Sequence, residues 1–469
     1  MFFLVFSSTV FLFIFLPFVY VIFLLAPTIK IKNFLLMLMS LVFYAFGEPV
    51  AVLLMLLSVL VNYFFGRCLS KEKIPRKVVL VSSVIFNLGM LSVFKYAGFF
   101  VEILNSVLPV DIPVPQISLP IGISFFTFQA LSYVIDVYRG DAPVQKKFGG
   151  LLLYIAFFPQ LIAGPIVRYN DIAEQLEERD ITLDKTILGI QRFIVGLSKK
   201  LLIANTVGYV ADTAFSLNSS EVSLPLAWLG AIAYVLQIYF DFSGYSDMAI
   251  GLGKIFGFEF KENFNYPYAA ESMRDFWRRW HISVSGWFKE YLYIPLGGNR
   301  KGSARTCINK LIVFFFTGLW HGASVTFIVW GLYHGIFLML EQYKIIPVDK
   351  IKFKLLKYIY TMLVVTVGFV IFRADTLSQA GVFIREMFTG FAVDSASFAL
   401  FVSQLNPLFV CTALLGAVLC APVVPWLAGK LKKESVRELA CCTGSLILLG
   451  LCIINLSSAT FNPFIYFRF

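Results

Sequence analysis

The sequence has few charged residues. Asp, Glu, Lys and Arg account for 14% of its 469 residues, whereas soluble domains carry roughly 25%. Hydrophobic residues account for 59%, Phe alone occurs 51 times, and the mean hydropathy is +0.80. In water such a chain would expose large apolar patches, which excludes a soluble globular protein. The composition predicts an integral membrane protein.

Residues that form metal sites and disulfides are also scarce. The chain has three histidines, and its seven cysteines show neither the paired spacing of a zinc site nor a disulfide framework. No metal site and no bound cofactor are expected. The first apolar run lacks a basic n-region and a clear cleavage site, so it is expected to be a retained span and not a signal peptide.

Uncharged apolar runs recur along the whole chain. Most approach the length that crosses the ~30 Å hydrocarbon core as a helix, and none shows the alternation of a membrane strand. The runs cover residues 1–29, 49–66, 78–94, 112–135, 148–167, 222–240, 311–340, 358–372, 395–429 and 439–467, with shorter candidates at 33–47 and 186–215. The prediction is an all-α polytopic membrane protein with about ten to twelve spans. No polar stretch is long enough for a soluble domain, so a single membrane domain over residues 1–469 is expected.

The formal net charge is +11. In a membrane protein an excess of Lys and Arg marks cytoplasmic loops, so a nucleic-acid partner is not expected. Basic residues in the first and third connections, such as Lys30 and Arg67, place both inside and the N-terminus outside. The predicted location is the cytoplasmic membrane, with lipids as surroundings.

Residues 261–310 form a basic and aromatic stretch that is expected to lie at the membrane interface. If it is helical, Trp277 shares a face with His281, and Asp275 shares a face with Arg279. The segment PLGGNRKG at 295–302 lacks the Walker spacing and is read as a turn. The patch either only sets topology or also binds the phosphates of a donor. The donor-phosphate candidates are Arg274, Arg278, Arg279 and Lys289.

All three histidines and five of the seven tryptophans fall within residues 277–334. His321 follows Lys310 by eleven residues, which on a helix is roughly 16 Å, near the bilayer midplane. It is either a structural histidine bonded between helices or a general base for a hydroxyl nucleophile. On one continuous helix His334 would be turned by about 220° from His321 and lie roughly 20 Å away. A structural role is expected for His334, and an exposed interfacial or a functional role for His281.

The charge-free run 311–340 raises a conflict, because basic residues flank it on both sides and one crossing cannot leave both inside. Two resolutions stay open: a re-entrant break around His321, which Gly322 directly after it makes possible, or tolerance of the later lysines on the outer side. Polar or helix-breaking residues also interrupt the apolar segments FFPQLIAGPIVRY and YFDFSGYSDMAIGLG. Irregular backbone at membrane depth is tolerated only where protein surrounds it or where it lines a water-filled cavity. Asp241 and Asp247 either pair with buried cations or line a polar path. The lining candidates are Asp241, Ser243, Tyr245, Asp247, Trp277, Trp320 and the asparagines that flank Phe264.

The segment RDFWRRWHISVSGWFKEYLYIPLGGNRKG at 274–302, followed by GLWHGASVTFIVWGLYHG at 318–335, resembles the membrane-bound O-acyltransferase family. The resemblance is to its bacterial branch typified by alginate O-acetyltransferases. It extends in family order to VFSSTVFLFIFLP, QIYFDFSGYSDMAIG, FRADTLSQA and the terminal FNPFIYFRF, and so covers essentially the whole chain. The LGGNRKG and FIYFRF stretches favour this branch over the sister branch that transfers D-alanine to teichoic acid.

The resemblance implies a helical ring around a central tunnel, with His321 as the catalytic residue and His281 in support from the cytoplasmic side. It implies an acetyl donor, either acetyl-CoA or an acetylated carrier thioester. The acetyl group would pass outward to an extracytoplasmic, esterase-like acetyltransferase partner that modifies a polysaccharide such as alginate, cellulose or peptidoglycan. Two alternatives outside this reading are a transporter or flippase, for which no inverted repeat is seen, and an inactive scaffold in which His321 is dispensable. The sequence names neither the polymer nor the partner.

Overall fold

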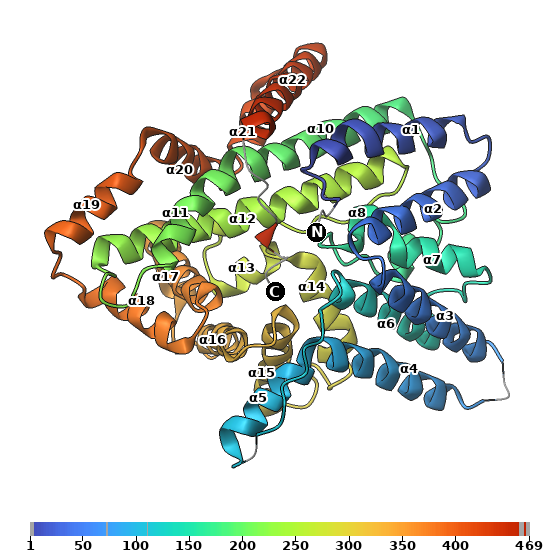
Figure 1. Cartoon of the computed structure of the whole chain (residues 1–469), viewed down its shortest axis with the longest axis horizontal. Helices are drawn as coiled ribbons and strands as arrows, with labels where there is room; N and C mark the ends of the chain where they lie inside the picture. The colour runs from blue at the N-terminus through green and yellow to red at the C-terminus, as the bar shows by residue number, and fades with distance from the viewer. Residues whose placement is uncertain (1–3, 72–73, 110, 459–463, 466–469) are drawn as a thin grey trace. The chain divides into compact units, whose positions relative to one another are not determined.

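A computed structural model describes residues 4–71, 74–109, 111–458 and 464–465. Helices dominate these residues and none of them lies in a β-strand, which confirms the predicted all-helical class. The chain divides into two compact units, Met1–Phe193 with Ser246–Lys261 and Ile194–Tyr245 with Glu262–Phe469. Figure 1 shows the helices in chain order. The single membrane domain and the ring around a tunnel stay predictions.

The first unit contains η1 (Phe11–Phe15), α1 (Leu16–Leu25), α2 (Ile29–Gly47), α3 (Ala51–Leu69), α4 (Arg76–Leu91), η2 (Ser92–Tyr96), α5 (Ala97–Val107), α6 (Ile123–Arg139), α7 (Phe148–Ala156), α8 (Phe158–Leu161) and α9 (Tyr169–Ile172). Two helices, α10 (Leu183–Ser198) and α12 (Leu224–Ile255), have residues in both units. The second unit contains η3 (Lys199–Ala204), α11 (Asn205–Phe215), η4 (Pro267–Ala269), α13 (Met273–Arg279), α14 (Ile282–Phe288), η5 (Lys289–Tyr293), α15 (Ser303–His321), α16 (Val325–Gln342), η6 (Val348–Lys350), α17 (Lys354–Arg373), α18 (Leu377–Thr389), α19 (Ser395–Gln404), α20 (Pro407–Leu419), α21 (Val423–Lys430) and α22 (Glu434–Ser458).

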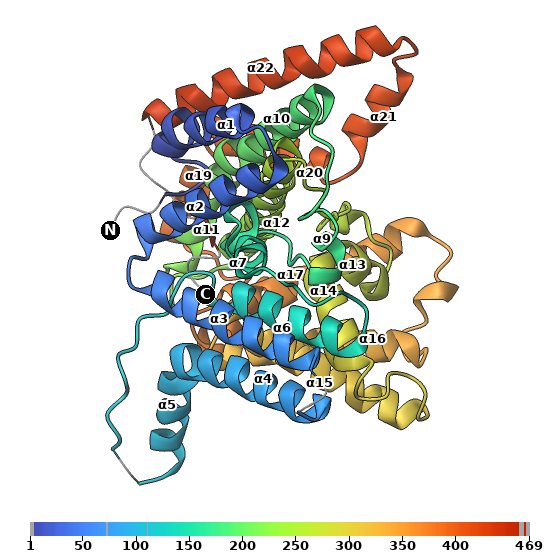
Figure 2. The ribbon, with the colours of Figure 1, turned by 90° about the vertical axis from the view of Figure 1, so that its right-hand side faces the viewer.

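In the first unit α3, α4 and α6 pack against one another (Figure 2). A reciprocal pair of amide hydrogen bonds joins α3 to α4: Asn62 Nδ2 donates to Asn87 Oδ1 at 3.0 Å, and Asn87 Nδ2 donates to Asn62 Oδ1 at 2.8 Å. Between apolar helices such polar pairs fix the register, because an unmatched amide away from water is costly.

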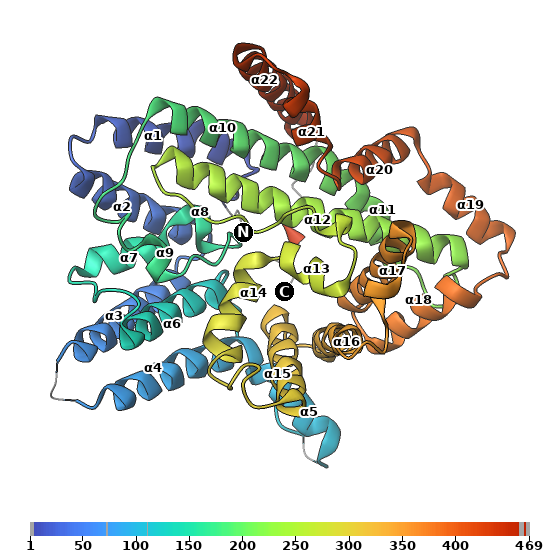
Figure 3. The same ribbon diagram turned by 180° about the vertical axis from the view of Figure 1, so that it is seen from behind.

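In the second unit α17 and α18 lie side by side (Figure 3), and α15 packs closely on α16. The last helix, α22, packs against η3 and is otherwise largely exposed. An exposed apolar helix of this kind suits a lipid environment.

Within the described residues seven helices are long and apolar enough to cross a membrane, or eight if the bent pair α19–α20 forms one span. The polytopic class is confirmed, with fewer such helices than the ten to twelve expected spans. The difference arises because several apolar runs do not form one long helix. Run 1–29 holds the short helix Phe11–Leu25, 148–167 contains α7 and α8, and 311–340 contains most of α15 and all but two residues of α16. By contrast, α12 runs unbroken through YFDFSGYSDMAIGLG, so the interruption predicted there is wrong.

Candidate active site

The run that was expected to cross the membrane once is a helical hairpin. α15 ends at His321, Gly322 is extended (φ −167°, ψ 154°), and α16 begins at Val325 after the side chain of Ser324 accepts a hydrogen bond from a first-turn N–H. Gly318 permits the close approach of the two helices, because a Cβ at this position would lie 2.2 Å from the carbonyl oxygen of Phe327. The predicted break after His321 is confirmed.

The hairpin also removes the topology conflict. Lys310 Nζ donates to Gln342 Oε1, and the Tyr343 hydroxyl donates to the carbonyl of Ser303 at 2.9 Å. The beginning of α15 and the end of α16 therefore lie together, and the basic residues that flank them are at the same end of the hairpin. His321 is at the opposite end, next to the turn.

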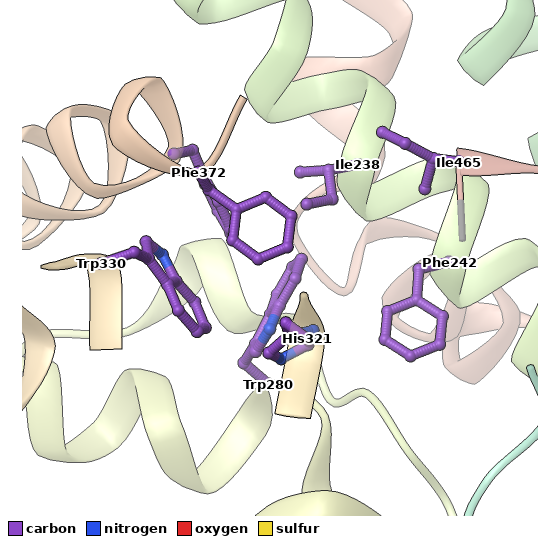
Figure 4. A pocket seen from close by; sticks show the side chains of 8 residues that line it. Ile238, Phe242, Trp280, His321, Trp330, Phe372 and Ile465 are labelled. Atoms are coloured by element: carbon purple, nitrogen blue, oxygen red, sulfur yellow. The ribbon is translucent and has the colours of Figure 1, made fainter. Parts of the chain in front are cut away.

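His321 lines a small cavity in the second unit (Figure 4). The other lining residues are Ile238, Phe242, Trp280, Trp330, Phe369, Phe372 and Ile465. The space is close to the size of one water molecule. Among these described lining residues His321 is the one ionisable side chain, so any acid–base chemistry in the cavity falls to its imidazole.

Aromatic rings fix the His321 side chain, which is 5% exposed. The ring centroids of Trp320, Trp330 and Phe372 lie 4.9, 5.1 and 5.3 Å from that of His321. The ring of His281 lies 6.2 Å away by the same measure. Two histidines far apart in the sequence therefore lie beside one another.

His281 reaches this place because the chain breaks there. α13 ends at Arg279, and His281 takes a left-handed backbone conformation (φ 44°, ψ 54°) before α14 begins. The helical face predicted for Trp277 and His281 is therefore wrong, since no helix joins them. His281 is 1% exposed, so it is not an exposed interfacial residue either.

Asn263 determines which nitrogen of His281 carries a proton. The Oδ1 atom of Asn263 lies 3.1 Å from the backbone nitrogen of Ser283, 2.9 Å from its hydroxyl oxygen and 3.2 Å from His281 Nδ1. A backbone N–H only donates, so this Asn263 atom is the amide oxygen and His281 Nδ1 carries a hydrogen. Burial lowers the pKa of His281 well below its usual range, and nearby His321 lowers it further. The neutral ring therefore leaves Nε2 as an acceptor.

His334 is nearer to the site than one continuous helix would allow. The ring of Trp330 contacts both His321 and His334, each with a centroid separation of 5.1 Å. His334 is 1% exposed, and neither of its ring nitrogens has a hydrogen-bond partner among the described residues. It does not line the cavity. A packing role for His334 stays a prediction that this geometry supports.

The polar residues predicted to line a path do not line the cavity. Asp241 accepts an ion pair from Lys200 at 2.5 Å, and both side chains are 3% exposed. Asp247 pairs with Arg192 at 2.6 Å within the first unit. For Asp241 this confirms the alternative of pairing with a buried cation, whereas Arg192, the partner of Asp247, is 35% exposed. Ser243 is buried, and its hydroxyl has no partner in the described part of the chain.

The remaining lining candidates lie in aromatic surroundings. Tyr245 packs on Phe464 with a centroid separation of 4.9 Å. Trp277 packs against Trp330 and His334 at 5.8 and 5.2 Å, one ring away from His321. Of the two asparagines that flank Phe264, Asn263 is 0% exposed and contacts His281, whereas the side chain of Asn265 is exposed.

Several cavity residues were missed by the sequence reasoning. Ile238 and Phe242 of α12, Trp280, and Phe372 of α17 carry no chemical signal beyond their place in apolar motifs. Ile465 lies in the terminal FNPFIYFRF motif, of which residues 461–463 and 466–469 lie outside the described residues. The Ile465 backbone N–H donates to Asp241 Oδ2 at 2.8 Å, which holds this part of the motif in place.

The basic stretch contains the short elements η4, α13, α14 and η5 and the beginning of α15. Arg279 is engaged by Asp275 at 2.9 Å, as predicted for residues four apart. Arg274, Arg278 and Lys289 are exposed and make no ion pair with the residues the structure describes. The carboxylate of Glu341 accepts hydrogen bonds from the backbone N–H groups of Met273 and Arg274 at 2.7 and 3.1 Å, which fixes the beginning of α13. PLGGNRKG is a turn, as predicted.

Known proteins are similar to this chain over almost its whole length. Residues 148–378 match the membrane-bound O-acyltransferase family. The chain is 40% identical to the probable alginate O-acetylase AlgI of Pseudomonas putida over 99% of this chain and 100% of the relative. It is 36% identical to a peptidoglycan O-acetyltransferase of Helicobacter pylori over 74% and 71% of the two chains. It is 29% identical to a teichoic acid D-alanyltransferase of Bacillus subtilis over 54% and 68%. The chain is therefore a multi-pass membrane protein and an O-acyltransferase that belongs to the membrane-bound O-acyltransferase family.

Proposed function

We propose that this protein transfers an acetyl group from a cytoplasmic thioester to an acceptor hydroxyl, for O-acetylation of an extracytoplasmic polysaccharide. The observation that carries the proposal is His321, the one ionisable side chain among the described residues that line an apolar cavity at the turn of a helical hairpin. The names of relatives that acetylate alginate and peptidoglycan support a glycan as the final acceptor.

His321 would act as a general base. Its imidazole takes the proton of the acceptor hydroxyl while the hydroxyl oxygen attacks the thioester carbonyl, and the C–S bond then breaks. The proton passes from the imidazole to the leaving thiolate, so the products are an ester and a free thiol. General-base catalysis of this kind contributes roughly 10²- to 10⁴-fold.

His281 would support His321 from the neighbouring position. Asn263 holds its proton on Nδ1, so Nε2 of the neutral ring is an acceptor, and the centroid of this ring lies 5.9 and 6.2 Å from those of Trp320 and His321. A fixed acceptor at this place can orient a donor group next to the reacting atoms. This role rests on a defined tautomer and not on proton transfer by His281 itself.

The size of the cavity favours a small acyl group. Trp280, Trp330, Phe372 and Ile465 surround His321 closely and leave space near that of a water molecule. An acetyl group needs a modest movement of these side chains, whereas a long acyl chain needs far more. The apolar walls would also exclude bulk water, which limits hydrolysis of the thioester.

The donor is proposed to be acetyl-CoA or an acetylated carrier, with Arg274, Arg278 and Lys289 as contacts for its phosphates. Their side chains are exposed and are not used in ion pairs with described residues. Arg279 is a weaker candidate, because Asp275 already engages it. The acetyl group is proposed to reach an extracytoplasmic esterase-like partner across the cytoplasmic membrane, with the N-terminus outside.

The test is His321→Ala in vesicles that contain the purified protein and an acceptor. Labelled acetyl thioester is supplied on one side, and label that becomes covalently bound to the acceptor is measured together with protein abundance. Transfer is expected to fall at least about 100-fold. Normal transfer at normal abundance would contradict the role of His321. Transfer of D-alanine in place of acetyl, or passage of an unchanged solute, would contradict the proposed reaction.

A further inference from the structure

A second, larger cavity lies in the first unit. It opens to the surface between the beginning of α2, the segment before α7 and the chain after α9, and its volume is about 410 Å³. This is within the range of cavities that hold small ligands. The lining residues that matter here are Lys30, Phe34, Met37, Lys147 and Glu177.

Three of these residues are charged and none is neutralised. Lys30, Lys147 and Glu177 make no ion pair with one another or with any other described residue. Other charges of the same unit do pair, for example Arg168 with Asp171 at 3.1 Å and Lys185 with Glu259 at 3.2 Å. The cavity therefore offers two cations and one anion to a ligand of complementary charge.

The position of Lys147 is defined by the fold. Its backbone N–H donates to the Oε1 atom of Gln145 at 3.1 Å, and Gln145 is 6% exposed and lines the same cavity. Lys30 lies in the first turn of α2. Both lysines are thus carried by helix beginnings that the packing of α2 on α7 brings together.

An apolar stripe continues from the cavity along α2. Phe34 lines the cavity and is 57% exposed, and Leu38, Val42 and Phe46 follow at intervals of four with exposures of 43%, 46% and 55%. Residues four apart lie on one helix face, so the stripe is about 18 Å long. This is close to the length of an extended fatty acyl chain, and a compact phosphate compound would leave the stripe uncovered.

We propose that this cavity binds the headgroup of a phospholipid that carries a phosphate and a primary ammonium group. The phosphate lies between Lys30 and Lys147, the ammonium lies at the carboxylate of Glu177, and one acyl chain follows the stripe from Phe34. Charge-assisted hydrogen bonds of these types are the strong ones in proteins. Both lysines belong to connections with a basic excess, which suits the cytoplasmic leaflet.

The experiment is a lipid titration of the purified, delipidated full-length protein in detergent, followed by native mass spectrometry. The probes are phosphatidylethanolamine and phosphatidylcholine with identical acyl chains, because choline keeps the positive charge but has no N–H to donate. The amine lipid is expected to bind about tenfold more tightly, which is the lower end of what one hydrogen bond to a charged group contributes. The variant Lys30→Gln/Lys147→Gln is expected to weaken its binding by about 25-fold, or about fivefold for each lysine.

Matched controls lie next to the cavity residues in the sequence. Lys32→Gln/Lys146→Gln removes the same charge from the same two segments, but neither residue lines the cavity. This variant is expected to bind as the wild type does. Glu177→Gln is expected to abolish the preference for the amine lipid over the choline lipid, whereas Glu178→Gln is expected to keep it.

Three results would overturn the proposal. Equal binding of the two lipids by the wild type would remove the headgroup recognition, and equal losses in the two lysine pairs would show unspecific attraction. Displacement of the lipid by coenzyme A at a lower concentration than the lipid itself requires would identify a phosphate cofactor as the occupant. If Lys30→Gln/Lys147→Gln lowers the thermal unfolding midpoint, the loss of lipid binding in that variant has no clear cause. The lipid preference of Glu177→Gln then tests the proposal, because this variant changes one exposed side chain.

Discussion

The hydrogen bonds of Asn263 yield the most specific prediction about the candidate site. In Asn263→Ala the N–H groups of His281 Nδ1 and Ser283 lose their acceptor inside the protein, while the Ser283 hydroxyl can rotate to another one. A buried donor without a partner costs about 1–3 kcal/mol. We therefore expect a loss of about 2–4 kcal/mol in the free energy of unfolding, reduced if water enters the vacated space.

The same change releases the tautomer of His281. A hydrogen bond worth about 1 kcal/mol that favours one tautomer changes its population about fivefold. We expect acetyl transfer per molecule of folded protein to fall about five- to tenfold in Asn263→Ala. Asn265→Ala is the matched control, because the Asn265 contacts to Arg279 use only its backbone and its side chain is exposed. It should transfer acetyl as the wild type does.

Asn263→Asp keeps the size of the side chain, so it tests the effect of the His281 protonation state separately from the effect of lost packing. A carboxylate beside His281 favours the imidazolium and raises the pKa of His281, which in the wild type is lowered by burial and by His321. Below that raised pKa both ring nitrogens carry protons and Nε2 no longer accepts. Acetyl transfer by the variant should therefore fall more steeply than transfer by the wild type as the pH is lowered. A constant ratio between the two pH profiles, or wild-type transfer by Asn263→Ala at equal abundance, would refute the reasoning.

Three further predictions concern the hairpin, the buried ion pair and the cavity wall. Gly318→Ala places a methyl group 2.2 Å from a backbone oxygen and should lower the free energy of unfolding by about 3 kcal/mol in thermal unfolding experiments. Gly286→Ala is the control, because nothing lies within 4 Å of its added Cβ, and it should be neutral or stabilising. Equal effects of the two changes would contradict the close approach of α15 and α16. Lys200→Met leaves the carboxylate of Asp241 buried without its cation and should lower the free energy of unfolding by about 3–5 kcal/mol. The double variant Lys200→Met/Asp241→Asn should recover most of this loss, and urea titration can measure both values. Ile465→Ala removes part of the cavity wall and should raise the ratio of propionyl to acetyl transfer, and an unchanged ratio would show that the wall does not select the acyl group.

Local sequence patterns predicted the features that depend on short-range chemistry. The basic residues on both sides of one apolar run left two explanations open, and a break after His321, made possible by Gly322, was one of them. The structure has that break. The pairing of Asp275 with Arg279 and the turn at 295–302 depend on neighbours within a few residues, and both are present. By contrast, Trp277 and His281 were expected on one helix face, and the left-handed backbone at His281 shows that the helix ends before it.

The sequence alone determined that this is a polytopic helical membrane protein and that His321 is the foremost candidate, because composition and motifs are properties of the chain itself. Only the tertiary structure decided which residues surround that histidine. Ile238, Trp280, Phe372 and Ile465 come from segments far apart in the chain, and apolar residues of this kind occur throughout a sequence that is 59% hydrophobic. Within the segment ENFNYP the sequence gives no reason to prefer Asn263 over Asn265, and only Asn263 contacts His281. Such contacts are set by the packing of helices on one another, and no short-range pattern in the chain encodes that packing.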